Sequence, residues 1–232
     1  MDRLLAVTGG ASGIGLGIVE AARGEGWQVA AADRIPVEGV ATLDVTDAAA
    51  VASWIGGLEG LRGVVCSAGI SAATPILDTD PEIFRRILDV NLTGSFLVAQ
   101  AAAKAMVAGG KGGSIVFVAS VSGLRGIQDR VAYGASKAAV INMAQVLAID
   151  LAKYGIRANA ICPAPIETPL VTRLHDAETR AQWISRIPAA RYGRVEEVAQ
   201  AALFLLDDAR SSYITGHALP VDGGYAGAGV MA

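Results

Sequence analysis

The sequence is poor in charged residues and has no cluster of basic ones. Charged residues make up 18% of its 232 residues, and the formal net charge at pH 7 is −3. A protein that binds nucleic acid needs a concentrated positive surface to neutralise phosphates, and no run of lysine and arginine provides one. The composition therefore argues against nucleic acid as a partner.

Cysteine is also scarce. Cys66 and Cys162 each lie in an apolar stretch, without the close spacing of a metal-binding knuckle or of a redox pair. A free cysteine behaves as a small apolar side chain, so we expect two buried thiols and no metal site.

Long hydrophobic runs are missing as well. No uninterrupted apolar run approaches the ~18 residues of a membrane-spanning helix. The first residues, MDRLLAVTGG, include an acid at position 2 and reach glycine before an apolar region of signal-peptide length. We therefore expect a cytoplasmic protein with no membrane partner.

Short apolar runs are abundant, and 53% of the residues are hydrophobic. Such runs are typical of strands buried on both faces of a parallel sheet. Stretches with helical spacing separate them, so the pattern predicts an α/β fold with one Rossmann-like, doubly wound parallel sheet and helices on both faces. The length suits a single domain over residues 1–232. The predicted strands span residues 3–8, 27–32, 61–67, 113–120, 156–162 and 217–224.

Two of the intervening segments have distinctive features. Residues 81–108 predict a long helix, with Pro81 in its first turn and Gly109 and Gly110 at its end. Residues 34–43, in contrast, are too few for a full crossover helix before the next short strand, near residues 37–43. We expect a loop in its place.

A glycine-rich stretch, VTGGASGIG at residues 7–15, follows the first predicted strand and opens an apolar helix. Backbone N–H groups at a helix N-terminus favour an anion such as a phosphate. Asp33 ends the second predicted strand, twenty residues after Gly13, where a carboxylate can accept hydrogen bonds from an adenosine ribose. Strand, glycines, helix, strand and acid in this order predict a dinucleotide site.

The first gap between these glycines is wider than in the usual GxGxxG motif, and TGGASGIG resembles the TGxxxGxG fingerprint of the short-chain dehydrogenase/reductase family. The resemblance continues in the same order through nearly the whole chain. Further matching stretches are LDV (residues 43–45), CSAG (66–69), DVNLTG (89–94), VASVSG (118–123), YGASK (133–137), PAPIET (163–168) and VDGG (221–224).

The resemblance implies four catalytic residues. Tyr133 would remove the alcohol proton during oxidation and return it during reduction. Lys137 would hold the nicotinamide ribose, Ser120 would orient the substrate oxygen, and Asn91 would anchor a water that passes protons to solvent. Tyr133 and Lys137 are four residues apart on a predicted helix and so share one face. Opposite charge from Lys137 and the oxidised nicotinamide should lower the pKa of Tyr133 from its usual value near 10.

The family also implies which residues bind the cofactor. Asp33 favours NAD, because a phosphate on the ribose would bring negative charge against it. Arg34 is the counter-signal, since a guanidinium there could reach such a phosphate. The implied cofactor residues are Gly9, Ser12, Gly13, Ile14, Gly15, Asp33, Asp44, Val45, Ser67, Ala68, Gly69, Tyr133, Lys137, Pro163, Ile166 and Thr168.

The sequence departs from the family pattern at two places. Cys66 and Ser67 replace two asparagines, which removes amides that could brace neighbouring strands. Ala164 replaces a glycine, which is harmless only if this residue does not need a positive φ. In residues 169–188, the stretch that covers the substrate in the family, His175 and Trp183 are either substrate contacts or a surface histidine and a packing tryptophan.

The expected function is hydride transfer between a nicotinamide cofactor, preferably NAD, and a small secondary alcohol or ketone. The alternative is a 3-oxoacyl reductase that acts on carrier-bound acyl chains, although Asp33 disfavours the phosphorylated cofactor that such enzymes usually prefer. A regulatory dinucleotide sensor would be favoured if the tyrosine or the lysine were missing, and both are present.

Two helical stretches, residues 96–108 and 135–152, are apolar and rich in alanine. Their apolar surface is larger than one sheet face can cover, so we expect a homotetramer.

Overall fold

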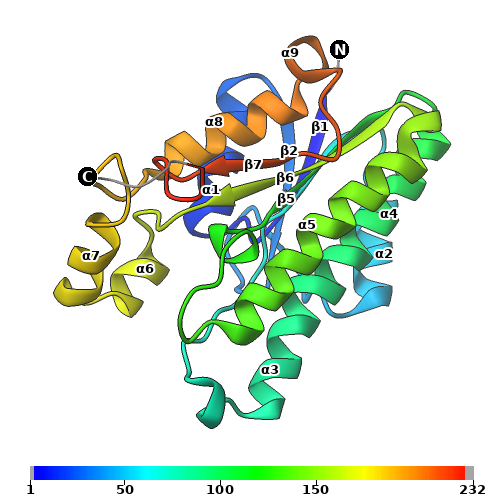
Figure 1. Ribbon diagram of the computed structural model, residues 1–232. Helices are drawn as coiled ribbons and strands as arrows, with labels where there is room; N and C mark the ends of the chain where they lie inside the picture. The colour runs from blue at the N-terminus through cyan, green and yellow to red at the C-terminus, as the bar shows by residue number, and fades with distance from the viewer. Residues whose placement is uncertain (1–2, 228–232) are drawn as a thin grey trace.

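The structure, a computed structural model, describes residues 3–227 and consists of a seven-stranded parallel sheet between two layers of helices (Figure 1). The strand order is β3-β2-β1-β4-β5-β6-β7. The chain therefore starts in the middle of the sheet and winds outward in both directions, as the sequence predicts. The strands are β1 Leu4–Thr8, β2 Gln28–Asp33, β3 Ala41–Thr42, β4 Leu61–Cys66, β5 Gly113–Val118, β6 Ile156–Pro163 and β7 Ala218–Val221.

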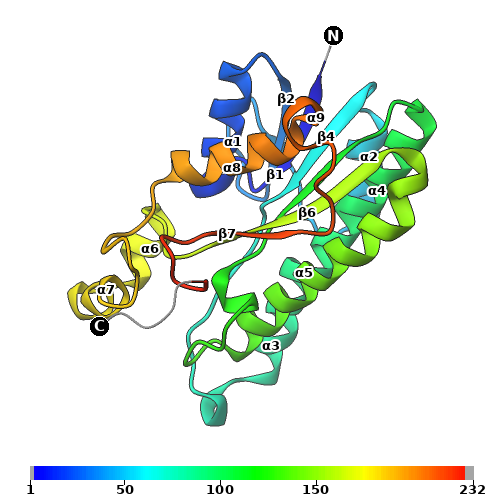
Figure 2. The same ribbon diagram turned by 45° about the horizontal axis from the view of Figure 1, so that its top comes forward.

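Helices cover both faces of this sheet. Residues of α2, α4 and α5 belong to one apolar core, and residues of α1 and α8 belong to a second core on the opposite face. Figures 1 and 2 show these two layers with the sheet between them. The α-helices are α1 Gly13–Gly24, α2 Ala48–Gly56, α3 Pro81–Leu88, α4 Gly94–Gly109, α5 Val131–Leu151, α6 Pro169–Leu174, α7 Ala177–Ile184, α8 Val195–Leu206 and α9 Asp208–Ser211.

Two inner strands of the sheet, β5 and β6, are fully buried. Every residue of β5 and β6 is buried, because each strand has a neighbour on both edges and helices on both faces. Burial on both faces explains why β5 lacks the apolar–polar alternation of a half-exposed strand, whereas the polar Arg157 and Asn159 of β6 are themselves buried. These strands form a rigid support whose carboxyl ends carry the candidate site.

The short connection after β2 is a loop, as predicted. Residues 34–40 contain no helix, and Val37 and Val40 form an isolated antiparallel bridge before the two-residue strand β3. Without a covering helix, the side chains of Ile35 and Val37 remain exposed. The predicted strand at residues 37–43 is thus correct in place but longer than the strand observed.

The helix predicted over residues 81–108 is present but is interrupted. It begins with Asp80 as N-cap and Pro81 in its first turn, and it ends at Gly110, whose left-handed backbone closes the last turn. Between α3 and α4, residues Asp89–Thr93 form one turn of π-helix. Such turns occur often at functional sites, and this one contains Asn91.

Two helical stretches, Pro81–Gly109 and Val131–Tyr154, are long and apolar enough to meet a length-and-composition criterion for a membrane span, although neither is an uninterrupted apolar run. Both lie along one face of the sheet (Figure 1). Packing against the sheet accounts for part of their apolar composition, as it does for core helices generally.

Candidate active site

The glycine-rich turn joins β1 to α1 near the middle of the sheet, where the strand order reverses. A β-carbon on Gly9 would lie 2.8 Å from the backbone nitrogen of Ala68, and one on Gly15 would lie 2.1 Å from the carbonyl oxygen of Gly9. Gly9 also has a positive φ of 68°. Side chains at either position would therefore clash with backbone, so the turn requires glycine for its close packing.

Ser12 precedes the first turn of α1 and has an extended backbone, and its side chain makes no capping hydrogen bond. The first amides of a helix lack partners within the helix. With no cap from Ser12, the amides of Gly13, Ile14 and Gly15 are available to an anion.

Asp33 is held at the carboxyl end of β2 by two backbone amides. Its Oδ2 accepts a hydrogen bond from the Ala11 N–H at 3.1 Å, and its Oδ1 accepts one from the Ile35 N–H at 3.0 Å. The carboxylate therefore links the glycine-rich turn to the loop after β2 and lies beside both. Each oxygen keeps a second lone pair with which to accept a ribose hydroxyl.

Asp44 and Val45 lie just beyond β3, next in the sheet to Asp33. The Asp44 carboxylate accepts hydrogen bonds from the Thr46 backbone at 2.9 Å and from the Thr46 hydroxyl at 2.7 Å. These bonds lower the pKa of Asp44. Val45 is buried, so the pair presents one charged and one apolar residue at this end of the sheet.

The segment after β6 comes close to the glycine-rich turn. A β-carbon on Gly13 would lie 3.6 Å from Cγ2 of Thr168, the residue that caps α6. Ile166 is buried and forms a parallel bridge with Gly193, which fixes the path from Pro163 to Thr168. The predicted cofactor residues from the two ends of the chain are thus brought together.

Ala164 fits without backbone strain. Among residues 3–227, the non-glycine residues with a positive φ are Asp129 and Ala190. Ala164 therefore does not need the left-handed conformation that would have favoured glycine.

Tyr133 and Lys137 face the same point, as their spacing predicts. The Lys137 ammonium lies 5.6 Å from the centre of the Tyr133 ring and donates a hydrogen bond to the Val118 carbonyl at 2.7 Å. A β-carbon on Gly69 would lie 3.6 Å from the same ammonium. Together with Ser67 and Ala68, Gly69 forms the segment that leaves β4, so the lysine lies between the ends of β4 and β5.

Ser120 follows the end of β5 and caps a short 3₁₀ turn. Its hydroxyl oxygen accepts a hydrogen bond from the Ser122 N–H at 3.1 Å. The side chain is buried near Tyr133 and hydrogen bonding from it favours the tyrosine phenolate.

The pKa of Tyr133 is raised in the protein without cofactor, opposite to the expectation from sequence. Burial disfavours the phenolate more than Ser120 and the positive charge of Arg130 favour it. The charge of Lys137 does not bring the pKa of Tyr133 back down. Burial lowers the pKa of Lys137 to about 8, so the lysine loses its charge before the tyrosine titrates. The sequence shows that the two side chains meet, but it does not show that Lys137 is buried and Tyr133 partly buried.

The side-chain amide of Asn91 forms hydrogen bonds with Ile70 and Ser136. Its Oδ1 accepts a hydrogen bond from the Ile70 N–H at 2.8 Å, and its Nδ2 donates to the Ile70 carbonyl at 2.9 Å and to the Ser136 hydroxyl at 3.0 Å. Ser136 in turn donates to the Tyr133 carbonyl at 2.7 Å. These hydrogen bonds connect the loop after β4 to the backbone of Tyr133. Ser136 forms part of this network and was not predicted from the sequence.

The two cysteines are buried, as predicted. Cys66 ends β4 and Cys162 lies in β6, and burial raises the pKa of each thiol to about 12. Both thiols therefore stay protonated near neutral pH and behave as apolar packing groups.

His175 lies between α6 and α7 inside a cluster of aromatic rings and is not a surface residue. Its Nδ1 is 2.9 Å from the Tyr192 hydroxyl, and its ring stacks on Trp183 at a centroid distance of 6.4 Å. Trp183 also packs on Tyr225 at 5.2 Å. Burial lowers the pKa of His175, and nearby Arg130 and Arg180 add to this effect. Trp183 thus packs against two aromatic rings, and contact of Trp183 or His175 with substrate remains a hypothesis.

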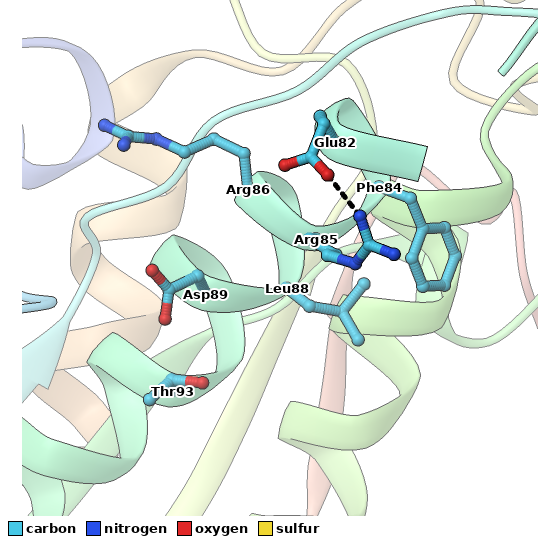
Figure 3. Close-up of a pocket in the computed structure, with 7 residues that line it drawn as sticks. All are labelled: Glu82, Phe84, Arg85, Arg86, Leu88, Asp89 and Thr93. Carbon is cyan, nitrogen blue, oxygen red and sulfur yellow. Dashed lines mark hydrogen bonds and ion pairs between the residues drawn. The ribbon is translucent and has the colours of Figure 1, made fainter. Parts of the chain in front are cut away.

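A separate hollow lies along α3 and the π turn (Figure 3). Figure 3 shows an ion pair between Glu82 and Arg85 at its edge. The residues that line it are Glu82, Phe84, Arg85, Arg86, Leu88, Asp89 and Thr93. None of them is a predicted site residue, so this hollow is distinct from the candidate active site.

The parallel sheet order, together with a glycine-rich turn at its centre, defines a Rossmann-type α/β protein. Residues 9–226 match a family model described as enoyl-(acyl carrier protein) reductase. The chain belongs to the short-chain dehydrogenase/reductase family and is an oxidoreductase of that family.

Relatives with different substrates are about equally similar to the chain. A 2-(S)-hydroxypropyl-CoM dehydrogenase of Xanthobacter autotrophicus is 36% identical, with 96% of each chain covered. The 3-oxoacyl-[acyl-carrier-protein] reductase MabA of Mycobacterium tuberculosis is 39% identical, covering 97% of this chain and 93% of the relative. An NAD-dependent glycerol dehydrogenase of Listeria innocua is 38% identical, covering 97% and 94%.

Solved structures of the family have the same fold. A gluconate 5-dehydrogenase from Burkholderia cenocepacia, in complex with NADP and tartrate, superposes with a TM-score of 0.92. It is 32% identical, with 98% of this chain and 97% of that chain covered. The fold predicted from the sequence is therefore confirmed.

Proposed function

We propose that this chain transfers hydride between a nicotinamide dinucleotide and a small secondary alcohol or ketone, with Tyr133 as general base and acid. The observation that carries the proposal is the placement of Tyr133, Lys137 and Ser120 together at the carboxyl ends of β4 and β5. Ligands of open α/β sheets bind at this edge, beside the point where the strand order reverses. We also propose that residues 1–232 act as one dinucleotide-binding and catalytic domain.

The residues present fit a dinucleotide. The free amides at the start of α1 would bind the pyrophosphate, and the close packing at Gly9 and Gly15 leaves backbone, with no side chain, facing it. Asp33 would accept hydrogen bonds from the adenosine ribose, with Asp44 and Val45 beside the adenine. Ile166 and Thr168 would hold the carboxamide end. When bound, the nicotinamide supplies the hydride acceptor or donor.

The chain's own contribution is to position the substrate and to move a proton. Ser120 would donate a hydrogen bond to the substrate oxygen, and the Tyr133 hydroxyl would take or return the proton of that oxygen. The raised pKa of Tyr133 favours the phenol, the form that donates a proton to a ketone. For oxidation, positive charge arriving beside Tyr133 would lower its pKa toward working pH. Lys137 would hold the ribose, and Asn91 would position the water that connects the site to solvent.

We propose NAD as the preferred cofactor because of Asp33. Its carboxylate is fixed by two amides and would meet the additional phosphate of NADP as a like charge. The NAD-dependent glycerol dehydrogenase supports this choice, whereas the gluconate dehydrogenase structure contains NADP. Arg34 lies next to Asp33 and is the residue that could favour NADP.

Reduction of carrier-bound 3-oxoacyl chains is the second candidate function. It is favoured by the 39% identity to MabA and by the matching family model. The two candidates differ in substrate and share the same catalytic residues. Acetoacetyl-CoA, a thioester, serves as a surrogate for the carrier-bound substrate. Activity on it therefore distinguishes the two candidate functions, but it does not test the role of Tyr133.

The test is a substrate panel with the purified full chain. Secondary alcohols, polyols, simple ketones and acetoacetyl-CoA are each assayed with both cofactors by absorbance of the reduced nicotinamide. The proposal expects turnover of at least one alcohol or ketone at a kcat/KM above that for acetoacetyl-CoA. A clear preference for the thioester would establish the second candidate, and no turnover of any substrate would overturn both.

A further inference from the structure

Arg130 is a cation next to the candidate active site to which none of the proposed steps assigns a role. It is the residue immediately before α5, and Tyr133 follows one turn later. Arg130 is the N-cap of α5 and its backbone is not helical, so its position relative to Tyr133 is set by its own contacts. Arg130 therefore projects from the same end of α5 as the proposed proton donor.

The side chain is held over the carboxyl edge of the sheet. Its Nη1 donates a hydrogen bond to the Ser71 hydroxyl at 2.6 Å, and Ser71 lies in the loop that continues from Gly69 beyond β4. The backbone supports this position, because the Thr74 N–H donates to the Asp129 carbonyl at 2.9 Å. Arg130 thus lies between the loop after β4 and the start of α5.

The backbone just before Arg130 takes an uncommon conformation. Asp129 has a φ of 61°, in the left-handed region that non-glycine residues seldom adopt. This turn sets the direction in which the chain enters α5 and so helps to fix the position of Arg130.

The guanidinium of Arg130 has N–H donors that make no hydrogen bond within residues 3–227. An arginine carries five N–H donors, whereas the hydrogen bond of its side chain within residues 3–227 is the one to Ser71. No carboxylate within those residues lies within 4.0 Å of it, although other arginines of the chain, such as Arg180 and Arg191, pair with glutamates. A half-buried, unpaired arginine is well suited to bind an oxyanion in bidentate fashion.

The positive charge of Arg130 acts on groups in two parts of the candidate site, the start of α5 and the segment between α6 and α7. Its charge lowers the pKa of Tyr133 on α5 and that of His175, between α6 and α7. Figures 1 and 2 show α6 and α7 beyond the strand ends, on the side toward which the start of α5 points. Arg130 therefore adds positive potential between the proton donor and the segment that covers the substrate in this family.

We propose that Arg130 is a specificity-determining residue that binds an anionic oxyacid group, such as a carboxylate or sulfonate, carried by the substrate. This inference rests on the proposed function and narrows it to keto or hydroxy acids. The anion would be bound by Arg130 and Ser71 while the reacting oxygen is held by Tyr133 and Ser120. Charge-assisted hydrogen bonds of this kind are about twice as strong as those between neutral groups.

The test compares ketones that carry a carboxylate with their uncharged methyl esters. Pyruvate, acetoacetate and levulinate are each assayed beside their methyl esters, with NADH and with NADPH, on the full-length protein. At least one acid is expected to exceed its ester in kcat/KM by about 10- to 100-fold. Arg130→Gln is expected to bring that ratio to about 1. The control, Arg125→Gln, removes the same charge from a nearby arginine that bonds the Ala226 carbonyl, and it should keep the wild-type ratio.

Two results would overturn the inference. The first is that the esters equal or exceed the acids in all three wild-type pairs. The second is that the acid-to-ester ratio survives in Arg130→Gln, because equal losses on acid and ester would show that Arg130 acts through Tyr133 and not on the substrate. If Arg130→Gln does not fold, Arg130→Lys replaces it: losing the planar fork should lower the ratio at least about threefold, and an unchanged ratio would contradict the proposal.

Failure of the proposed function gives a different result. If none of the six ketones is reduced with either cofactor, titration calorimetry with the three acids decides. At least tenfold tighter binding of one acid to the wild type than to Arg130→Gln would support the anion site without the reaction. Equal binding, or none, would overturn the anion site as well.

Discussion

Lys137 combines burial with a charge, and its pKa of about 8 has a consequence for stability. In the unfolded chain the same lysine titrates at 10.5. Between pH 8 and 10.5 the unfolded state therefore binds more protons than the folded state, so the free energy of unfolding gains a contribution that rises with pH. Below pH 8 both states are protonated, and the full cost of burying the ammonium remains.

We predict that Lys137→Met removes this pH dependence. Urea denaturation of the cofactor-free protein at pH 7.5, 8.5 and 9.5 should show the free energy of unfolding of the wild type rising relative to that of Lys137→Met. Comparing the two proteins at each pH cancels the titration of groups that do not interact with Lys137. A constant difference across this range would show that Lys137 keeps an ordinary pKa.

Asp33 is the residue on which cofactor choice depends. Asp33→Asn keeps an acceptor for the amides of Ala11 or Ile35 but removes the charge. We expect the ratio of kcat/KM for NAD to that for NADP to fall at least about tenfold, because a like-charge repulsion of several kcal/mol is relieved. Glu38→Gln removes an exposed charge from the same loop and should leave the ratio as it is. A wild-type enzyme that prefers NADP would contradict the assignment at once.

At this scale, residue types and spacing predict which side chains meet, but not their electrostatics. The spacing of Tyr133 and Lys137 is enough to place both on one face of α5. The direction of the Tyr133 pKa shift is not predictable in this way, because it depends on burial by β5 and its neighbours. Ser136 was missed for a related reason. Its role depends on a hydrogen bond from Asn91, which lies 45 residues earlier, and the sequence of the helix does not indicate this contact.

Among the elements, α1 and the turn before it allow the sharpest test of the phosphate site. We predict that Gly15→Ala weakens binding of NADH at least about tenfold, because a new methyl group would lie 2.1 Å from the Gly9 carbonyl oxygen and displace the turn. Gly24→Ala is the matched control at the other end of the same helix, where a β-carbon meets nothing within 4 Å. Fluorescence titration with NADH measures both. Equal affinity in the two variants would mean that this turn does not bind the cofactor.

Strands and helices were predictable where the local pattern agrees with the final packing. The apolar runs of β5 and β6 identify buried strands, and Pro81 and Gly110 mark the ends of a helical stretch. The π turn at Asp89–Thr93 was not predictable, because it depends on hydrogen bonds that Asn91 and Ser95 make after folding. The length of β3 likewise depends on pairing with β2 and not on its own sequence.

For the whole molecule, the outer faces of α4 and α5 remain unusually apolar. Phe96 on α4 is 42% exposed, and Val146 and Ile149 on α5 are 47% and 78% exposed. We propose that these faces meet in a homotetramer. Contiguous apolar surface of this kind marks sites of association in soluble proteins.

We predict that Ile149→Glu lowers the oligomeric mass measured by light scattering at micromolar concentration, because it introduces charge into a helix–helix contact. Tyr213→Glu alters a fully exposed residue that follows α9 and should leave the mass unchanged. A wild-type protein of monomer mass would refute the tetramer. From the sequence we also expect a tail of small residues, residues 225–232, to cross a second interface; this tail lies in part outside the described residues.

The overall architecture follows from the alternation of strands and helices, whereas the assembly of the site depends on the whole fold. Gly13 and Thr168 are 155 residues apart in sequence and become neighbours because the strand order reverses at β1 and β4. Alternation indicates that parallel strands bring their carboxyl ends to one edge. It does not indicate the contact of Arg130 with Ser71, which depends on two loops.

The central claim is that Tyr133 moves the proton in a reaction with a nicotinamide cofactor, and Tyr133→Phe tests it most directly. The substitution removes the hydroxyl and leaves the glycine-rich turn and Asp33 in place. With the best substrate of the panel, kcat is expected to fall by about 10²- to 10⁴-fold. The dissociation constant for NADH, measured by fluorescence in the same preparation, should stay within about threefold of the wild-type value, since no phosphate or adenosine contact is lost. A Tyr133→Phe variant that keeps a near wild-type kcat would contradict the account, because the proton would then move through another group.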